Sequence, residues 1–164
     1  MYKQRADDFR VKQDYNKAIQ DYNIVLKSIN DGNAFNSRGL CHYYLKNYEQ
    51  AISDYQNAFL YDSTLKQTSY LNNLGTAYVK KKDYLIAKEN FDFFEKLDPK
   101  NGRVYRNWAM YYALQNNKPL ALENLQKAIS LGYKDLKWIE TDDSLESIRG
   151  EKGYKDIIEQ LNKQ

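Results

Sequence analysis

The sequence is poor in the residues that end helices or crosslink chains. Its 164 residues include seven glycines, two prolines and a single cysteine, Cys41. So few glycines and prolines leave little material for long loops, which favours helices joined by tight turns. A single cysteine excludes an intrachain disulfide and a metal cluster built from several cysteines.

Long apolar runs and a dominant charge are lacking as well. No apolar run approaches the roughly 20 residues needed to span a bilayer, and the N-terminus, MYKQRADDFR, has no hydrophobic signal segment. We therefore expect a soluble, cytoplasmic protein with no membrane partner. The 25 basic and 22 acidic residues are spread along the chain and give a net charge of +3. This balance does not indicate nucleic-acid binding, and we expect no nucleic-acid partner.

Motifs for catalysis or metal binding are absent from the sequence. His42 is the only histidine, and it directly follows Cys41. Adjacent residues on a helix point about 100° apart, so these two do not form a catalytic pair. The acidic pairs Asp7–Asp8 and Asp142–Asp143 read as surface or helix-start acids. Without a glycine-rich phosphate loop, an HExxH or a CxxC motif, we expect no enzyme activity, metal or cofactor.

What the sequence has in quantity is aromatic residues, with 16 tyrosines, six phenylalanines and two tryptophans. Tyrosine buries its ring and keeps its hydroxyl near water, so it suits thin layers that are never deeply buried. A chain of this composition is expected to fold rather than to remain disordered.

Residues 71–99 carry a pattern of small and large side chains that fits two packed helices. Gly75 and Ala87 are small where two antiparallel helices would cross closely, and larger rings surround that crossing. Pro99 follows the second helix, where a residue that cannot continue a helix does no harm. The full pattern is Leu71, Leu74, Gly75, Tyr78, Tyr84, Ala87, Phe91 and Pro99.

The same pattern recurs along most of the chain. The small residue of the second helix returns at intervals of 33, 36 and 34 residues, and the small residue of the first helix returns with it. An array of similar units is therefore expected. The two sets are Ala18, Ala51, Ala87 and Ala121, and Ala6, Gly39, Gly75 and Ala109.

These units resemble the tetratricopeptide repeat (TPR), a helix–turn–helix unit of about 34 residues. The resemblance implies an all-α fold, a right-handed α-solenoid of antiparallel helix pairs. We expect one continuous solenoid domain with four repeats at 1–31, 32–67, 68–101 and 102–133, followed by C-terminal capping helices at 134–164.

Local signals predict several helix boundaries. The first repeat should hold helices near Tyr2–Lys12 and Tyr15–Ile29, followed by a break at Asp31–Gly32. Pro119 should lie just inside the start of a helix, where its missing N–H costs nothing. Two additional residues at Thr64–Gln67 account for the interval of 36.

The segment after Gly132 lacks the small residues of the repeats. Its last part places four apolar residues at spacings i, i+3, i+4 and i+7, which predicts a helix with one apolar stripe. Repeat arrays need a cap because the last repeat otherwise exposes its stacking face. The stripe expected to dock as this cap is Tyr154, Ile157, Ile158 and Leu161.

In TPR proteins the first helix of each repeat lines a concave groove, so the resemblance implies a binding surface there. Asn73 and Asn107 occupy equivalent positions and could pair with a peptide backbone, since an amide both donates and accepts hydrogen bonds. Arg103 and Arg106 would favour acidic ligand residues. The candidate ligand-binding residues are Asn36, Leu40, Tyr43, Asn72, Asn73, Thr76, Arg103, Arg106, Asn107 and Met110.

One specialised use of the fold is not indicated. TPR co-chaperones that grip the C-terminal carboxylate of Hsp70 and Hsp90 use Lys and Asn on the first repeat, Asn on the second, and Lys with Arg on the third. In the first three units only Lys3 matches, and the other places hold Asp7, Ser37, Ser69 and Asn73. Shifting the pattern by one repeat gives Asn36, Leu40, Asn73, Arg103 and Asn107, which keeps only the middle Asn and one basic residue. This is not a carboxylate clamp.

The function expected from the resemblance is that of a protein–protein interaction scaffold, which binds a peptide or partner protein in its groove. An alternative is a self-associating structural array, a homo-oligomer through an uncapped N-terminal face, since Met1 falls almost at a helix start. A further alternative is that the chain is the sensor or scaffold segment of a larger multidomain protein.

Overall fold

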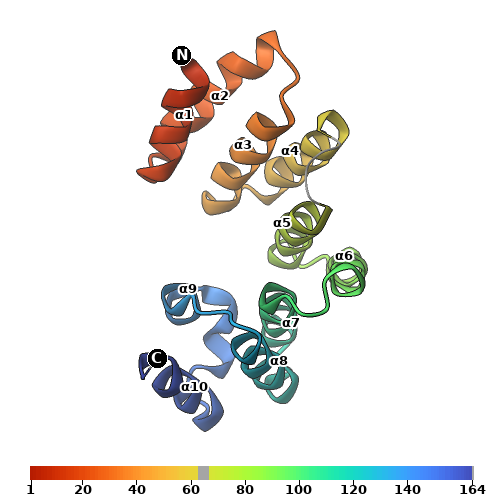
Figure 1. Ribbon diagram of the computed structural model, residues 1–164, viewed down its shortest axis with the longest axis vertical. Coiled ribbons are helices and arrows are strands. Elements are labelled where there is room, and N and C mark those ends of the chain that lie inside the picture. Colours follow the sequence, from red (N-terminus) through yellow and green to blue (C-terminus); the bar gives the residue numbers. More distant parts are fainter. Residues whose placement is uncertain (63–66, 164) are drawn as a thin grey trace. The chain divides into compact units, whose positions relative to one another are not determined.

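A computed structural model describes residues 1–62 and 67–163, and every regular element in these ranges is a helix (Figure 1). The chain divides into two compact units, residues 1–87 and residues 88–164. Over the described residues, no helix combines the length and the apolar composition required to cross a membrane.

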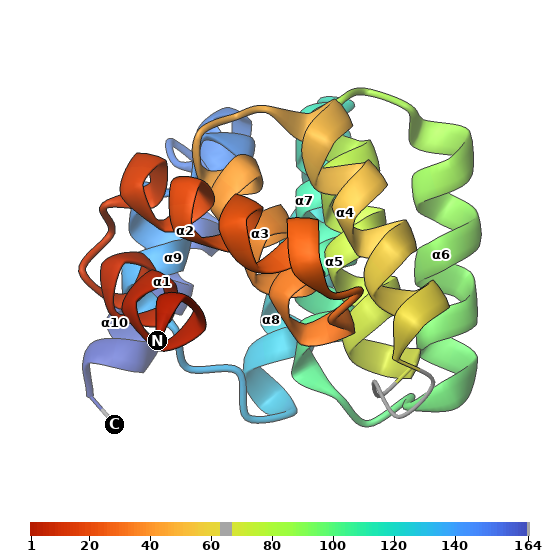
Figure 2. The same cartoon turned by 90° about the horizontal axis from the view of Figure 1, so that it is seen from above.

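The first unit is built from helix pairs joined by short turns. In Figures 1 and 2 the helices of each pair, α1 with α2 and α3 with α4, lie beside each other, and α3 also packs on α2. Its helices are α1 (Tyr2–Val11), α2 (Tyr15–Ser28), α3 (Gly32–Tyr44), α4 (Tyr48–Tyr61) and α5 (Gln67–Lys80).

The second unit continues with one further pair and a different C-terminal part. The helix α6 (Tyr84–Leu97) spans the division between the units. The pair α7 and α8 pack together, and α7 also contacts the 3-10 helix η1. The elements of this unit are α7 (Gly102–Leu114), α8 (Lys118–Ser130), α9 (Leu136–Thr141), η1 (Asp143–Ile148) and α10 (Lys152–Asn162).

These boundaries agree closely with the expected helices of the first repeat. Pro119 lies in the first turn of α8, as predicted. The predicted insertion at Thr64–Gln67 lies outside the described residues, apart from Gln67, which begins α5. The repeat boundaries themselves stay a prediction.

The turn inside each helix pair has the same backbone at four places. One residue per turn takes a left-handed conformation, with φ between 58° and 68°, and the residue after it donates its N–H five residues back. Each of these hydrogen bonds is 2.9 Å long. A three-residue turn of this kind reverses the chain, which places the two helices antiparallel. The left-handed residues are Gln13, Lys46, Lys82 and Asn116.

The small residues of the pattern mark close helix approaches. A Cβ atom on Gly39 would lie 2.8 Å from the Tyr55 ring of α4, which is too close for any side chain. Ala6 and Ala18 are fully buried and pack with Tyr22 in the first pair. The predicted crossing of small residues is therefore confirmed for α3 and α4.

The expected break at Asp31–Gly32 has a different role in the structure. Helix α2 already ends at Ser28, and Asp31 caps α3 by accepting a 2.9 Å hydrogen bond from the Ala34 N–H. A Cβ on Gly32 would lie 2.8 Å from the Ala58 carbonyl oxygen at the end of α4. Gly32 is therefore needed for a close approach of two helices rather than to end one, and the predicted break was wrong in its cause.

The C-terminal segment docks as predicted. Tyr154, Ile157 and Leu161 of α10 are buried, with Ile158 packed beside them. The Tyr154 hydroxyl donates a 2.8 Å hydrogen bond to the Ile139 carbonyl of α9. The same cluster includes buried side chains of α7, α8, α9 and η1, namely Ala109, Ala113, Ala121, Leu125, Ile129, Ile139, Leu145 and Ile148.

Two arginine–aspartate pairs, one in each of the first two helix pairs, were not anticipated. Both Arg5 and Arg38 bind both carboxylate oxygens of an aspartate 16 residues later, at 2.6–2.8 Å. The aspartate side chains are almost buried, with 6% of Asp21 and 4% of Asp54 exposed. The recurrence of Arg and Asp at this spacing, 33 residues apart, was the signal in the sequence that could have revealed the pairs.

The first of these pairs makes stability depend on acid pH. The hydrogen bonds from Arg5 lower the pKa of Asp21, although burial opposes the shift. Because the folded-state pKa lies below the unfolded value of about 3.9, the stabilisation is complete above that pH and is lost as the pH falls through the folded-state pKa. Asp21→Asn should therefore lower stability at pH 7 and flatten the acid limb of the stability curve.

Urea unfolding followed by far-UV circular dichroism from neutral pH down to about pH 2.5 measures this effect. Asp156→Asn is the matched control, because it makes the same chemical change at an exposed aspartate. An acid limb of unchanged slope in Asp21→Asn would contradict the assignment.

Candidate functional site

Two asparagines on the first helices of neighbouring pairs lie in direct contact. The amide nitrogen of Asn73 on α5 donates a 3.0 Å hydrogen bond to the amide oxygen of Asn36 on α3. The Asn73 oxygen in turn accepts a 2.9 Å hydrogen bond from the Asn72 amide. A chain of side-chain amides therefore links the two helices, and both Asn36 and Asn73 remain partly exposed.

Two further predicted site residues, Asn72 and Thr76, form hydrogen bonds with Asn73. Asn72 and Thr76 are buried. The Thr76 hydroxyl donates a 2.9 Å hydrogen bond to the Asn73 backbone carbonyl within α5. Their contacts fix the Asn73 side chain and backbone, so that Asn73 presents its remaining hydrogen-bonding capacity in one orientation.

Apolar side chains continue the surface along α3. Leu40 and Tyr43 follow Asn36 at i+4 and i+7, which places all three on one helix face. Both are partly buried and pack against a cluster that includes Tyr55 and Leu74. We call Asn36, Leu40, Tyr43 and Asn73 the inner patch; it combines two amides with an apolar strip and lies entirely within the first unit.

The candidate residues of the second unit are arranged differently. The Arg106 guanidinium lies 4.7 Å from the Trp138 ring centre and 5.9 Å from that of Tyr133. Asn107 and Met110 are fully buried, with 0% of each residue exposed. A ligand would reach these two only after neighbouring side chains moved, and their role in binding stays a prediction. Arg103, in contrast, is exposed.

Cys41 and His42 are placed unfavourably for nucleophilic chemistry. Burial raises the pKa of the Cys41 thiol to about 11, so the reactive thiolate is scarce at neutral pH. Burial also lowers the pKa of His42, whose Nε2 lies 4.0 Å from the Asp54 carboxylate. In the described part of the chain, no group of three or more His, Cys, Asp and Glu residues could hold a metal ion.

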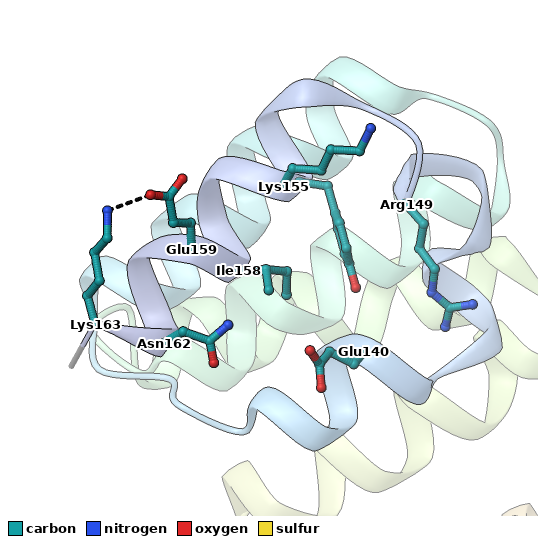
Figure 3. A pocket seen from close by; sticks show the side chains of 8 residues that line it. Glu140, Arg149, Lys155, Ile158, Glu159, Asn162 and Lys163 are labelled. Atoms are coloured by element: carbon teal, nitrogen blue, oxygen red, sulfur yellow. Dashed lines mark hydrogen bonds and ion pairs between the residues drawn. The ribbon is translucent and has the colours of Figure 1, made fainter.

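An open pocket of about 530 Å³ lies between α9 and α10 in the second unit (Figure 3). Tyr154 and Ile158 form its apolar part, and Ile158 points into the space between the helices. The rim carries charges of both signs, including an ion pair of 2.6 Å between Lys163 and Glu159. Such a rim does not select a ligand by charge. The sequence had predicted only the docking stripe of α10 and gave no signal for this pocket.

Comparison with known proteins identifies one of the expected repeats. The family model of the tetratricopeptide repeat matches residues 32–64, which contain α3 and α4. The sequence has no significant match among curated proteins.

Solved structures resemble the chain over most of its length. MamA from Desulfovibrio magneticus RS-1 is 16% identical, with a TM-score of 0.71 over 99% of this chain and 94% of that one. YrrB, a TPR protein, is 14% identical, with a TM-score of 0.64 over 99% of this chain and 91% of YrrB. The second TPR domain of human RPAP3 is 21% identical, with a TM-score of 0.56 over 78% of this chain and 92% of that domain.

The matched repeat, the recurring helix pairs and the similar structures lead to one conclusion. Residues 32–64 match the tetratricopeptide repeat, and the chain has the all-α fold of antiparallel helix pairs that these similar structures share.

Proposed function

We propose that this protein is an interaction scaffold that binds an extended peptide segment of a partner protein through the inner patch. The observation that carries the proposal is the amide contact between Asn73 and Asn36 across two neighbouring first helices. This contact fixes two polar side chains beside the apolar side chains of Leu40 and Tyr43.

The chemistry of these amides suits a peptide backbone. Each asparagine amide has two N–H donors and an oxygen with two lone pairs. The contacts made within the protein use one donor of Asn73 and one lone pair of each oxygen, so donors and acceptors remain for a ligand. Because backbone N–H and C=O groups are the same in every peptide, the amides supply affinity, and Leu40 and Tyr43 select apolar side chains.

Structures with the same fold support peptide binding as the function. The RPAP3 domain was solved in complex with the HSP70 peptide SGPTIEEVD. The YrrB structure is described as having an unusual peptide-binding site. The carboxylate-clamp residues are not retained in this chain, so we propose a ligand bound through its backbone rather than through a terminal carboxylate. Catalysis has no part in the proposal.

The double variant Asn36→Ala with Asn73→Ala tests the inner patch. Crosslinking in the native cell would capture a partner, and a synthetic peptide covering the crosslinked segment would be titrated by calorimetry. Losing two hydrogen bonds should weaken binding by about 1–3 kcal/mol, or roughly fivefold to more than a hundredfold. The fold should be retained because both side chains are partly exposed.

A matched control makes the same change at two exposed asparagines, Asn16→Ala with Asn30→Ala. The control should bind the peptide as the unchanged protein does. Equal affinity of the folded inner-patch variant and this control would rule the inner patch out as the peptide site.

A further inference from the structure

A second cavity lies in the second unit, where the loop before α7 meets the loop after α8. It has a volume of about 400 Å³ and is lined by residues 100–103 and 131–135. Clefts that hold small ligands or side chains typically measure about 300–1,000 Å³. The cavity is therefore large enough for more than one small charged group. We call it the loop cavity.

The two loops that form the loop cavity are held in fixed positions by their backbones. Gly132 ends α8 with a left-handed φ of 89°, and its N–H donates a 2.9 Å hydrogen bond to the Ile129 carbonyl. The next N–H, that of Tyr133, donates a 3.0 Å hydrogen bond to the Ala128 carbonyl. A Cβ on Gly102 would lie 2.7 Å from that same oxygen. The loops approach this closely only because Gly102 has no side chain.

The side chains around the loop cavity are predominantly basic. Lys100, Arg103 and Lys134 line it together with one acid, Asp135. The Asp135 carboxylate is already engaged, because it accepts a 3.0 Å hydrogen bond from the Trp138 N–H and caps α9. Considering residues 1–62 and 67–163, none of the three basic side chains forms an ion pair with a carboxylate. A net positive charge thus surrounds the cavity.

Two polar side chains of the lining, Asn101 and Tyr133, carry no charge of their own. The Asn101 amide oxygen accepts a 3.0 Å hydrogen bond from the Arg103 backbone N–H. The Asn101 amide nitrogen donates a 2.9 Å hydrogen bond to the Asp98 carboxylate. Burial raises the pKa of Tyr133 to about 12, so its phenol stays uncharged at neutral pH. Arg106 lies over the rings of Tyr133 and Trp138.

We propose that the loop cavity binds an acidic segment of a polypeptide partner, with the carboxylates of neighbouring acidic side chains facing Lys100, Arg103 and Lys134. The three cationic side chains lie on two separate loops, so several carboxylates linked in one chain can pair with them at the same time. One small ion would fill only a small part of the cavity volume. The site differs from the inner patch in place and in chemistry, and the two are tested by different variants.

The test is a nuclear magnetic resonance titration of the full chain with a defined probe. The probe is the acetylated and amidated peptide (Glu-Ser)₃, and the neutral control is (Gln-Ser)₃. We expect saturable shifts of the backbone amides of Gly102, Arg103, Gly132 and Lys134 with the acidic peptide only. Added salt should weaken the binding, because the contacts are exposed charges.

A triple variant with Lys100→Gln, Arg103→Gln and Lys134→Gln should bind the acidic peptide about tenfold more weakly, since each exposed pair contributes modestly. The matched control removes the same charge elsewhere, with Lys12→Gln, Lys27→Gln and Lys152→Gln at exposed positions. It should keep its affinity within about twofold.

Three outcomes would overturn the proposal. One is a set of amide shifts spread over the protein surface, and another is equal weakening in both triple variants. The third is saturation of the same amides by inorganic phosphate when the acidic peptide has no effect, which would indicate a site for a free anion. The Asn36→Ala, Asn73→Ala variant leaves the loop cavity unchanged and should bind the acidic peptide normally. Failure of the inner-patch proposal would therefore leave this result unchanged, and failure of the loop-cavity proposal would not.

Discussion

Removal of residues 150–164 is expected to unfold the second unit. This deletion removes α10 and exposes the cluster formed by α7, α8, α9 and η1. Burial of an apolar side chain stabilises by about 1.5–3 kcal/mol. The deletion removes three buried side chains, Tyr154, Ile157 and Leu161, and the partly buried Ile158. The entropy recovered by freeing the helix offsets part of the loss. The remainder is comparable with the total stability of a typical domain, about 5–15 kcal/mol.

Tryptophan fluorescence reports specifically on this unit, because Trp108 and Trp138 are the two tryptophans of the chain and both lie in it. Urea titration of the truncated protein should show a strongly reduced fluorescence midpoint or an already unfolded signal. A fluorescence transition at the same urea concentration in both proteins would show that α10 is a dispensable appendage.

Point variants give the same test without deleting backbone. Ile157→Ala should cost about 2–5 kcal/mol, since the side chain is buried in the cluster. Lys155→Ala on the exposed side of the same helix should change stability by less than about 0.5 kcal/mol. Both variants introduce alanine into the same helix, so their effects on helix propensity are similar. The difference between their free energies of unfolding therefore measures the packing of Ile157.

The parts of the fold that the sequence predicted well are those fixed by local, periodic signals. Helix pairs, their short turns and the apolar stripe of α10 follow from side-chain spacing within about 30 residues. The crossing at Gly39 was predictable because a small residue recurs at this position in every unit and the ring of Tyr55 has aromatic equivalents, Tyr22 and Phe91, in two others. In each case the residues that decide the structure lie close together in the sequence.

The features that were missed depend on residues that meet through the fold. Gly32 resembles a helix break in sequence, and its close approach to Ala58 is visible only when α3 and α4 are packed. The loop cavity joins residues near 100 with residues near 134, and no single stretch is unusually basic. For the candidate site, α3 and α5 do bring Asn36 and Asn73 together, but burial of Asn107 was not evident from its equivalent position.

Replacement of Arg38 by leucine should destabilise the first unit more than almost any other single charged-to-apolar change. Arg38 of α3 donates hydrogen bonds of 2.8 and 2.6 Å to the two oxygens of Asp54 on α4. It also donates a 2.6 Å hydrogen bond to Asn23 on α2, so one side chain links three helices. Only 4% of the Asp54 side chain is exposed. Loss of the partner of a buried carboxylate typically costs about 3–5 kcal/mol.

The comparison with Arg5→Leu sharpens this prediction. The Arg5 side chain is 55% exposed, against 20% for Arg38, and water can more readily replace it beside Asp21. Arg5→Leu should therefore cost less. The double variant Arg38→Leu with Asp54→Leu should recover much of the stability, because an apolar pair leaves no buried charge unpaired.

The pH dependence of Arg38→Leu identifies the cause of its instability. Burial lowers the pKa of His42, the nearby Arg38 charge lowers it further, and Asp54 opposes both. Without Arg38 the pKa of His42 should rise, and protonated His42 can pair with Asp54 from its present distance of 4.0 Å. A raised folded-state pKa stabilises the fold at low pH and loses this effect as the pH rises through that value. The stability deficit of Arg38→Leu should therefore shrink between about pH 7 and pH 5, as measured by hydrogen exchange of α3 and α4. A deficit that is constant over this range would show that lost packing, rather than the unpaired Asp54 charge, destabilises the variant.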